Sequence, residues 1–113
     1  MEHKMGLYVE FFEAIKEGKK KVEVRLNDEK RRELKVGHII EFTKLPEQNE
    51  TIKVEVSELE EYSTFQAMYE EVPFTAFGCE GWSMAEMLKG TYEIYSAKQE
   101  TTWGTLAIGV KVL

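Results

Sequence analysis

Cysteine, proline and long apolar runs are scarce in this sequence, and each scarcity excludes a class of protein. The only cysteine is Cys79, so no disulfide can form within the chain and a reducing cytoplasm is the expected compartment. This cysteine and the two histidines, His3 and His38, do not have the spacing of zinc-finger ligands. We therefore expect neither a metal nor a cofactor. No segment approaches the ~20 apolar residues that span a bilayer, and the first residues do not resemble a signal peptide.

The length and charge of the chain bound its architecture and its partners. We expect one domain, residues 1–113, with a modest core and no repeat or linker. The net charge of −6 argues against indiscriminate coating of nucleic acid. Yet nine of the fifteen Lys and Arg residues lie between Lys16 and Lys35. A local basic patch on an acidic body favours a short, defined anionic ligand over long duplex DNA.

The most informative segment runs from Gly18 to Arg25. From Lys21 onward, charged and apolar residues alternate, which predicts a strand. Its apolar set is Val22, Val24 and Leu26, and its charged set is Lys21, Glu23 and Arg25. The charged set is expected to line the opposite surface at intervals of ~6.6 Å. Gly18, Lys19 and Lys20 precede it and predict a mobile, positive entrance. The competing interpretation is an ordinary solvated strand face.

The remaining pattern predicts strands mixed with short helices. A helix is expected over residues 6–17, ending at Gly18, and a strand hairpin over residues 38–44 and from Thr51, with a turn at 46–49 between them. Capping boxes at Ser63 and Ser83 each predict a short helix. The last strand is expected to point Leu106, Ile108, Val110 and Val112 inward and Ala107, Gly109 and Lys111 outward. The fold class is therefore a small α+β barrel.

This order of elements resembles the ASCH family of small PUA-like β-barrels from about Tyr8 to Val112. The residues that carry the resemblance are Gly18–Arg25 and Gly37–Phe42, with weaker support from Trp103–Ile108. It implies a PUA-like mixed β-barrel with peripheral short helices. It also implies a cleft between barrel and helices, lined by the Lys, Glu and Arg of the first motif, in a family proposed to bind RNA.

The resemblance also raises the question of catalysis. One branch of the family hydrolyses N4-acetylcytidine with a Lys, a Thr nucleophile and a Glu, and another member is described as a ribonuclease. Aligned spacing puts the Lys at Lys20 and the acid at Glu80, but Glu23 occupies the position of the Thr. A carboxylate cannot simply replace a hydroxyl in attack on an amide. Whether the protein is an enzyme stays open; if it is, Lys20, Glu23 and Glu80 are the catalytic candidates.

Three functions follow from these features. The first is a module that binds single-stranded or irregular RNA, or a modified nucleoside, and its candidate contacts are Lys19, Lys20, Lys21, Glu23, Arg25, Trp82 and Trp103. The second is a small hydrolase of modified nucleosides or a ribonuclease. The third is a domain that binds an acidic protein partner.

Each candidate also has a purely structural interpretation. Lys20 fits a solvated loop, and Arg25 a plain ion pair with Glu23. Glu80 fits an exposed loop. Trp82 fits a hydrophobic staple with Met87, and Trp103 fits the core. His38 is expected to face solvent, and Cys79 to be an idle thiol.

Overall fold

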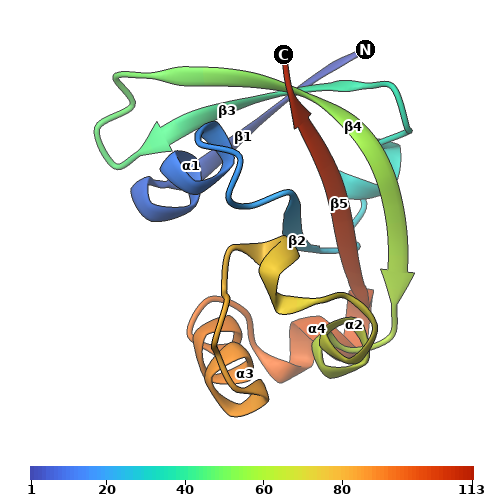
Figure 1. Ribbon diagram of the computed structural model, residues 1–113. Helices are drawn as coiled ribbons and strands as arrows, with labels where there is room; N and C mark the ends of the chain where they lie inside the picture. The colour runs from blue at the N-terminus through green and yellow to red at the C-terminus, as the bar shows by residue number, and fades with distance from the viewer.

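The computed structural model describes all 113 residues and is built on one five-stranded sheet. Its strands are β1 (Glu2–Tyr8), β2 (Val22–Leu26), β3 (Ile39–Leu45), β4 (Thr51–Tyr62) and β5 (Thr105–Val112). Its helices are α1 (Val9–Lys16), α2 (Phe65–Glu71), α3 (Met84–Tyr92) and α4 (Ala97–Trp103), with 3-10 turns η1 (Arg31–Glu33) and η2 (Phe74–Phe77). Helix α1 lies beside β1 and β3, whereas α2, α3 and α4 gather at the opposite end of the molecule (Figure 1).

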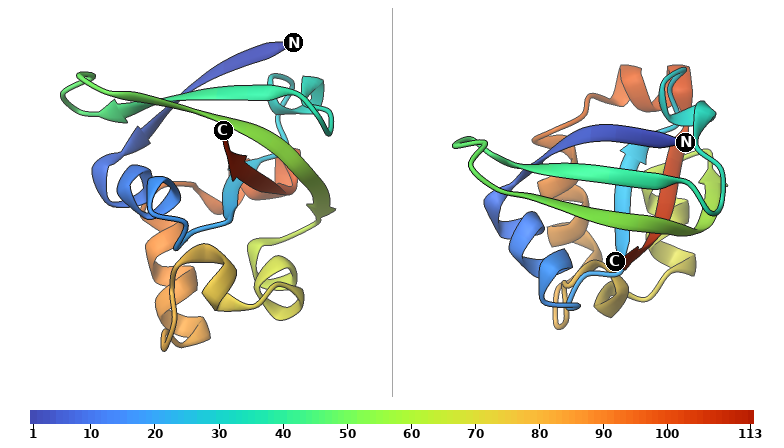
Figure 2. Two further views of the ribbon diagram at one scale, coloured as in Figure 1. Left: turned by 45° about the horizontal axis from the view of Figure 1, so that its top comes forward. Right: turned by 90° about the horizontal axis from the view of Figure 1, so that it is seen from above.

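The sheet curves into a half-barrel because one long strand serves two partners. The strand order is β1-β3-β4-β5-β2, with β1 parallel to β3 and all other pairs antiparallel. Residues 51–55 of β4 pair with β3, and residues 54–62 pair with β5, with a bulge between Val56 and Glu58. In Figure 2, β2 and β5 cross beneath β1, β3 and β4. The predicted α+β fold, a mixed barrel with peripheral short helices, is confirmed.

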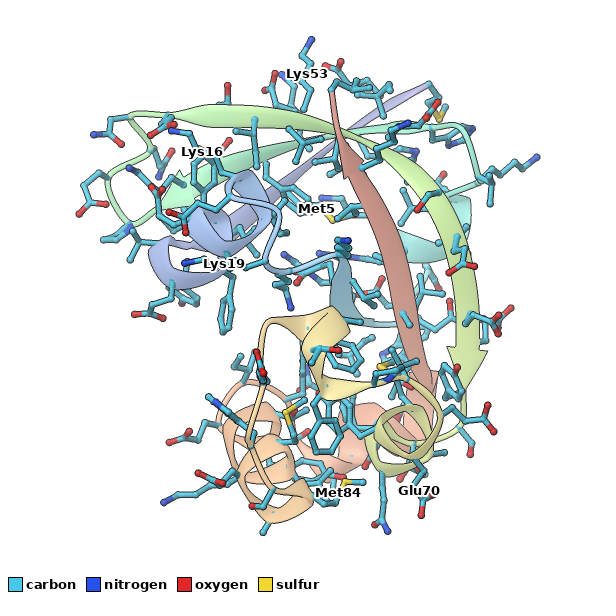
Figure 3. The ribbon with its side chains drawn as sticks, in the orientation of Figure 1. Met5, Lys16, Lys19, Lys53, Glu70 and Met84 are labelled. Atoms are coloured by element: carbon cyan, nitrogen blue, oxygen red, sulfur yellow. The ribbon has the colours of Figure 1, made fainter.

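The N-terminal prediction is wrong in part, because residues 2–8 form a strand. In β1, His3, Met5 and Leu7 are buried and alternate with more exposed residues, which is the period of a strand. Met5 pairs with Phe42 of β3 and lies inside the half-barrel (Figure 3). Helix α1 therefore begins at Val9, and the predicted end at Gly18 is confirmed by its φ of +79°.

Two hydrophobic cores lie on opposite faces of the β2–β5 pair. The larger core fills the half-barrel and includes Ile40, Phe42, Val54 and Val56, all fully buried as the hairpin pattern predicts. The smaller core lies between the sheet and the helices α2 and α3. Strand β5 is consequently covered on both faces over most of its length. The prediction of an outward face is wrong for Ala107, which belongs to the smaller core, and for Gly109, which is buried against β4. Lys111 is exposed as predicted, whereas Val112, predicted inward, is also exposed.

Side-chain caps set the helix starts. The predicted capping box at Ser83 is confirmed, since Ser83 accepts from the Glu86 N–H and Glu86 accepts from the Ser83 N–H. The predicted box at Ser63 is wrong by one residue, because Thr64 is the N-cap of α2 and accepts from Ala67. A further box at Ser96 starts α4. No helix is both long and apolar enough to cross a membrane.

His38 pairs with His3, whereas the sequence predicted that His38 faces solvent. Its Nδ1 lies 3.0 Å from Nε2 of His3, and the two rings stack with centroids 5.1 Å apart. The Lys35 N–H also approaches His38 Nδ1, at 3.3 Å. The pair exists because β1 brings the N-terminal residues alongside the segment that leads into β3. Missing β1 in the sequence therefore meant missing this contact.

Candidate functional site

One cavity stands out between α1, the floor strand β2 and the helix α3. It has a volume of about 200 Å³, and 12 of its 18 lining residues are hydrophobic. Strand β1, helix α1, strand β2, the loop before α3 and the segment after α3 all contribute to the lining. The volume lies below the ~300–1,000 Å³ of pockets for drug-sized molecules, which suits a single small ring system.

Three charged side chains form the polar end of this cavity. Glu23 and Lys20 are only 5% and 6% exposed, and the Glu23 carboxylate faces a cation on each side. Its Oε1 lies 3.5 Å from Lys20 Nζ, and its Oε2 accepts from Arg25 Nε at 2.7 Å. No other charged residue lines the cavity, so the cluster of two cations and one anion leaves an excess of positive charge there.

The predicted exposed charged face of β2 is therefore wrong for Glu23, and the predicted mobile entrance is wrong for Lys20. The connection from α1 turns at Gly18, and the Lys20 N–H bonds to the Ala14 carbonyl, which directs this lysine inward. Helix α3 and the loop before it then cover the charged face of the strand. Lys21 stays exposed, and its backbone N–H bonds to Ala76 of η2.

The Lys20 side chain is nearly buried, and its ammonium lies near aromatic rings with few protein partners. Nζ lies 5.4 Å from the ring centroid of Phe11 and 5.8 Å from that of Phe77. Glu23 is its only ion-pair partner, at a separation of 3.5 Å that is too long for a good hydrogen bond, and the ammonium donates no hydrogen bond to any protein acceptor. An ammonium carries three donors, so Lys20 is free to bind an acceptor that enters the cavity.

Arg25 joins the two free edges of the sheet. Its Nε donates to Glu23, and its Nη2 donates to the backbone carbonyl of Gly6 in β1 at 2.8 Å. Burial lowers the pKa of Arg25, but the facing carboxylate of Glu23 more than compensates, and the pKa is raised above its ordinary value. Arg25 is thus a fixed cation whose remaining N–H groups lie at the cavity.

Aromatic side chains form the walls and the rim. Phe11 and Tyr95 are half-buried in the wall, whereas Tyr8 and Trp82 are 56% and 47% exposed at the rim. The indole of Trp82 packs beside Gly90 of α3, where a β-carbon would lie 3.9 Å from it. A cavity edged by aromatic rings is suited to stacking on a planar ligand.

Two other polar groups of the lining, the hydroxyls of Tyr69 and Thr91, are already engaged. The Tyr69 hydroxyl bonds to Oγ1 of Thr91 at 2.7 Å, and Thr91 donates to the Met87 carbonyl at 2.8 Å. Burial raises the pKa of Tyr69 to about 12. Burial also raises the pKa of the Cys79 thiol, although Lys20 opposes this, so the thiol stays protonated near neutral pH. None of these groups is an activated nucleophile.

The structure brings together only some of the residues singled out in the sequence. Lys20, Glu23, Arg25 and Trp82 line the cavity, whereas Lys19, Lys21, Glu80 and Trp103 do not. Lys19 and Glu80 are exposed. Trp103 packs against the smaller core, and its ring lies 5.6 Å from the Arg32 guanidinium.

Three aromatic residues of the cavity, Tyr8, Phe11 and Tyr95, were not predicted from the sequence. They come from β1, from α1 and from the segment between α3 and α4, and no local pattern marks all three as neighbours. No group of three or more His, Cys, Asp and Glu residues is placed to hold a metal ion.

Comparison with known proteins decides the family. The family model described as the ASCH domain matches residues 5–113. The chain belongs to the ASCH domain family. ASCH domains are generally proposed to bind RNA. A comparison with curated proteins finds no match.

Solved structures agree with this assignment. The crystal structure of the hypothetical protein PH0355 is 36% identical, with a TM-score of 0.89 and full coverage of both chains. The solution structure of PF0455 from Pyrococcus furiosus is also 36% identical, with a TM-score of 0.79, and the match covers 100% of this chain and 98% of the other. The S128A mutant of ZmASCH from Zymomonas mobilis is 17% identical, with a TM-score of 0.64 over 97% of this chain and 67% of the other, which supports the ASCH fold alone.

Proposed function

We propose that this ASCH domain binds one nucleobase, presented by single-stranded RNA or as a modified nucleoside, in the cavity above β2. The observation that carries the proposal is the Lys20 ammonium, which is nearly buried and donates no hydrogen bond to the protein. Burying a charge is costly unless partners compensate. A base carbonyl or ring nitrogen is the kind of acceptor that an ammonium in an aromatic cavity can bind.

The surrounding groups support a base in preference to a phosphate. Most of the lining is hydrophobic, and an isolated phosphate would lose its hydration in such a cavity with little compensation. A base fits because its faces can stack on the aromatic walls while its polar edge meets Lys20, Glu23 and Arg25. The two cations offer hydrogen-bond donors and the carboxylate offers an acceptor. The three residues can therefore bind a base edge that carries both acceptors and donors.

The direct test is equilibrium binding of nucleosides and short RNA oligomers to purified protein. Lys20→Met is expected to weaken binding about 10- to 150-fold, the worth of one hydrogen bond from a charged donor at ~1.5–3 kcal/mol. The matched control is Lys111→Met, which removes the same charge from an exposed position on β5 outside the cavity. Equal binding by the wild type and by Lys20→Met would refute the proposed role of Lys20.

The flanking lysines need separate variants. Lys19 and Lys21 lie outside the cavity lining, so their part in binding can only be electrostatic attraction of the ligand. We expect Lys19→Met and Lys21→Met to weaken RNA binding at low salt and to leave nucleoside binding unchanged. A loss of nucleoside binding in either variant would place the ligand elsewhere.

Hydrolysis is the second candidate, and one observation favours it. Lys20 and Glu23 lie 3.5 Å apart in an apolar cavity, a setting in which proton transfer is possible. Against it, Glu80 is exposed outside the lining and Glu23 already faces two cations. Incubation with acylated cytidines and short RNA, followed by chromatography, tests this candidate. Products that are absent with Lys20→Met would establish an enzyme.

A further inference from the structure

The free edge of β1 forms a path that leads away from the cavity. Strand β1 is at the end of the sheet order and pairs only with β3. Two of its outward carbonyls face cations: that of Gly6 accepts from Arg25 at 2.8 Å, and that of Lys4 accepts from Lys30 Nζ at 3.4 Å. Two residues of a strand span ~6.6 Å, so the Lys30 ammonium follows Arg25 at about that interval along the edge.

Arg31 follows Lys30 in the chain and is incompletely paired. Its backbone and one Nη1 bond to the Asp28 carboxylate, but its Nε is buried with no hydrogen-bond partner. Lys30, by contrast, is exposed and makes only the long contact with Lys4.

The rim of the cavity also offers exposed apolar side chains for contacts beyond those of an isolated nucleoside. Tyr8, Trp82 and Ile94 are large apolar side chains that line the cavity and stay about half exposed or more. Such residues gathered at one opening mark an interaction surface. The charge pattern agrees, because residues 16–35 hold nine cations and five anions in a chain of net charge −6.

We infer that a single-stranded RNA enters with one base in the cavity, and that its phosphodiester backbone follows the free edge of β1 to Lys30 and Arg31. This inference rests on the proposed base-binding function and extends it from a nucleoside to a polymer. The occupant is a single strand because its base must leave any stack to enter the cavity. The phosphates are the groups that complement the cations beyond the cavity.

The test compares polymer with monomer in the Lys30→Gln/Arg31→Gln double variant. The probes are the pentamers of cytidylate, uridylate and adenylate, with cytidine, uridine and adenosine as monomers. For single strands, the logarithm of the binding constant falls with the logarithm of salt concentration by ~0.7 per phosphate contact. We therefore expect the double variant to lower the magnitude of this slope by about 1.4 for the pentamer that binds best, and to leave nucleoside affinity unchanged.

The outcomes separate this inference from the proposed function. Lys111→Gln is the charge control and is expected to leave the salt slope as in the wild type. If a nucleoside binds but its pentamer binds no more tightly, or the double variant keeps the full slope, the backbone path is refuted and base binding stands. If neither nucleoside nor pentamer binds, both are refuted. To show that the double variant is folded, its thermal unfolding is compared with that of Lys30→Gln alone, which changes only an exposed side chain.

Discussion

Replacing Lys20 by Met is expected to weaken ligand binding about 10- to 150-fold and yet leave folding stability nearly unchanged. The attraction between Lys20 and Glu23 at 3.5 Å is about 5 kcal/mol at an effective dielectric constant of ~20. Removing an ammonium from water costs several kcal/mol, which offsets most of that attraction. Met retains much of the apolar side chain beside Phe11 and Phe77. The expected change in the free energy of unfolding is therefore within about 1 kcal/mol of zero.

Glu23→Gln is the contrasting variant, because it leaves two cations buried without their anion. Breaking a buried ion pair from one side costs about 3–5 kcal/mol. With an unfolding entropy of ~2.1 cal/mol/K per residue, that loss lowers the melting temperature of 113 residues by about 13–21 °C. Adding Lys20→Met to Glu23→Gln is expected to recover part of the loss, because one of the uncompensated cations is then gone.

Urea and thermal unfolding, followed by far-ultraviolet circular dichroism, measure these differences. Lys111→Met is the exposed control and is expected to change the free energy of unfolding by less than about 0.5 kcal/mol. A loss of 3 kcal/mol or more in Lys20→Met would mean that Lys20 is a structural cation. An unchanged Glu23→Gln would mean that the cluster is better hydrated than its burial indicates. Either result would refute the reasoning from the cavity electrostatics.

Three further predictions concern the rim, a helix cap and the histidine pair. Trp82→Ala is expected to weaken base binding by ~1–3 kcal/mol in a titration, with little change in melting temperature because the ring is about half exposed. Ser83→Ala removes the cap of α3 and should cost ~1 kcal/mol, or about 4 °C in melting temperature, measured by calorimetry. Burial, the N-terminal amine, His3 and Lys35 lower the pKa of His38 in the folded protein, so the unfolded chain binds more protons and stability should fall as pH drops below ~6.5. His38→Asn should flatten that pH profile; an identical profile in the variant would contradict this.

Local signals in the sequence were sufficient for much of the fold. The alternation in β2, β3 and the first part of β4 requires a strand period of two residues, and in β3 and β4 a single buried face fixes which parity points inward. The turn at Gly18 and the capping box at Ser83 each depend on hydrogen bonds between residues that are close together in the chain. Strand β1 was missed because Leu7, the last buried residue of the strand, lies four residues before Phe11 and so imitates a helical spacing.

The site depended on contacts that no local pattern contains. The charges of the motif were correctly noted in the sequence, and the structure places Lys20, Glu23 and Arg25 together. Whether they face water or a cavity was decided by α3 and its loop, which lie some sixty residues further along the chain. The same long-range packing moved Glu80 and Trp103 away from the cavity.

The sequence by itself determined the strand and helix periods, the chain turn at Gly18 and the identity of the charged cluster, because these depend on neighbours along the chain. Only the tertiary structure decided that Lys20 and Glu23 are buried, that Arg25 reaches the Gly6 carbonyl, and that aromatic rings from separate elements surround them. Burial and electrostatics depend on what the folded chain places within a few ångströms, and most of those atoms come from distant positions in the sequence.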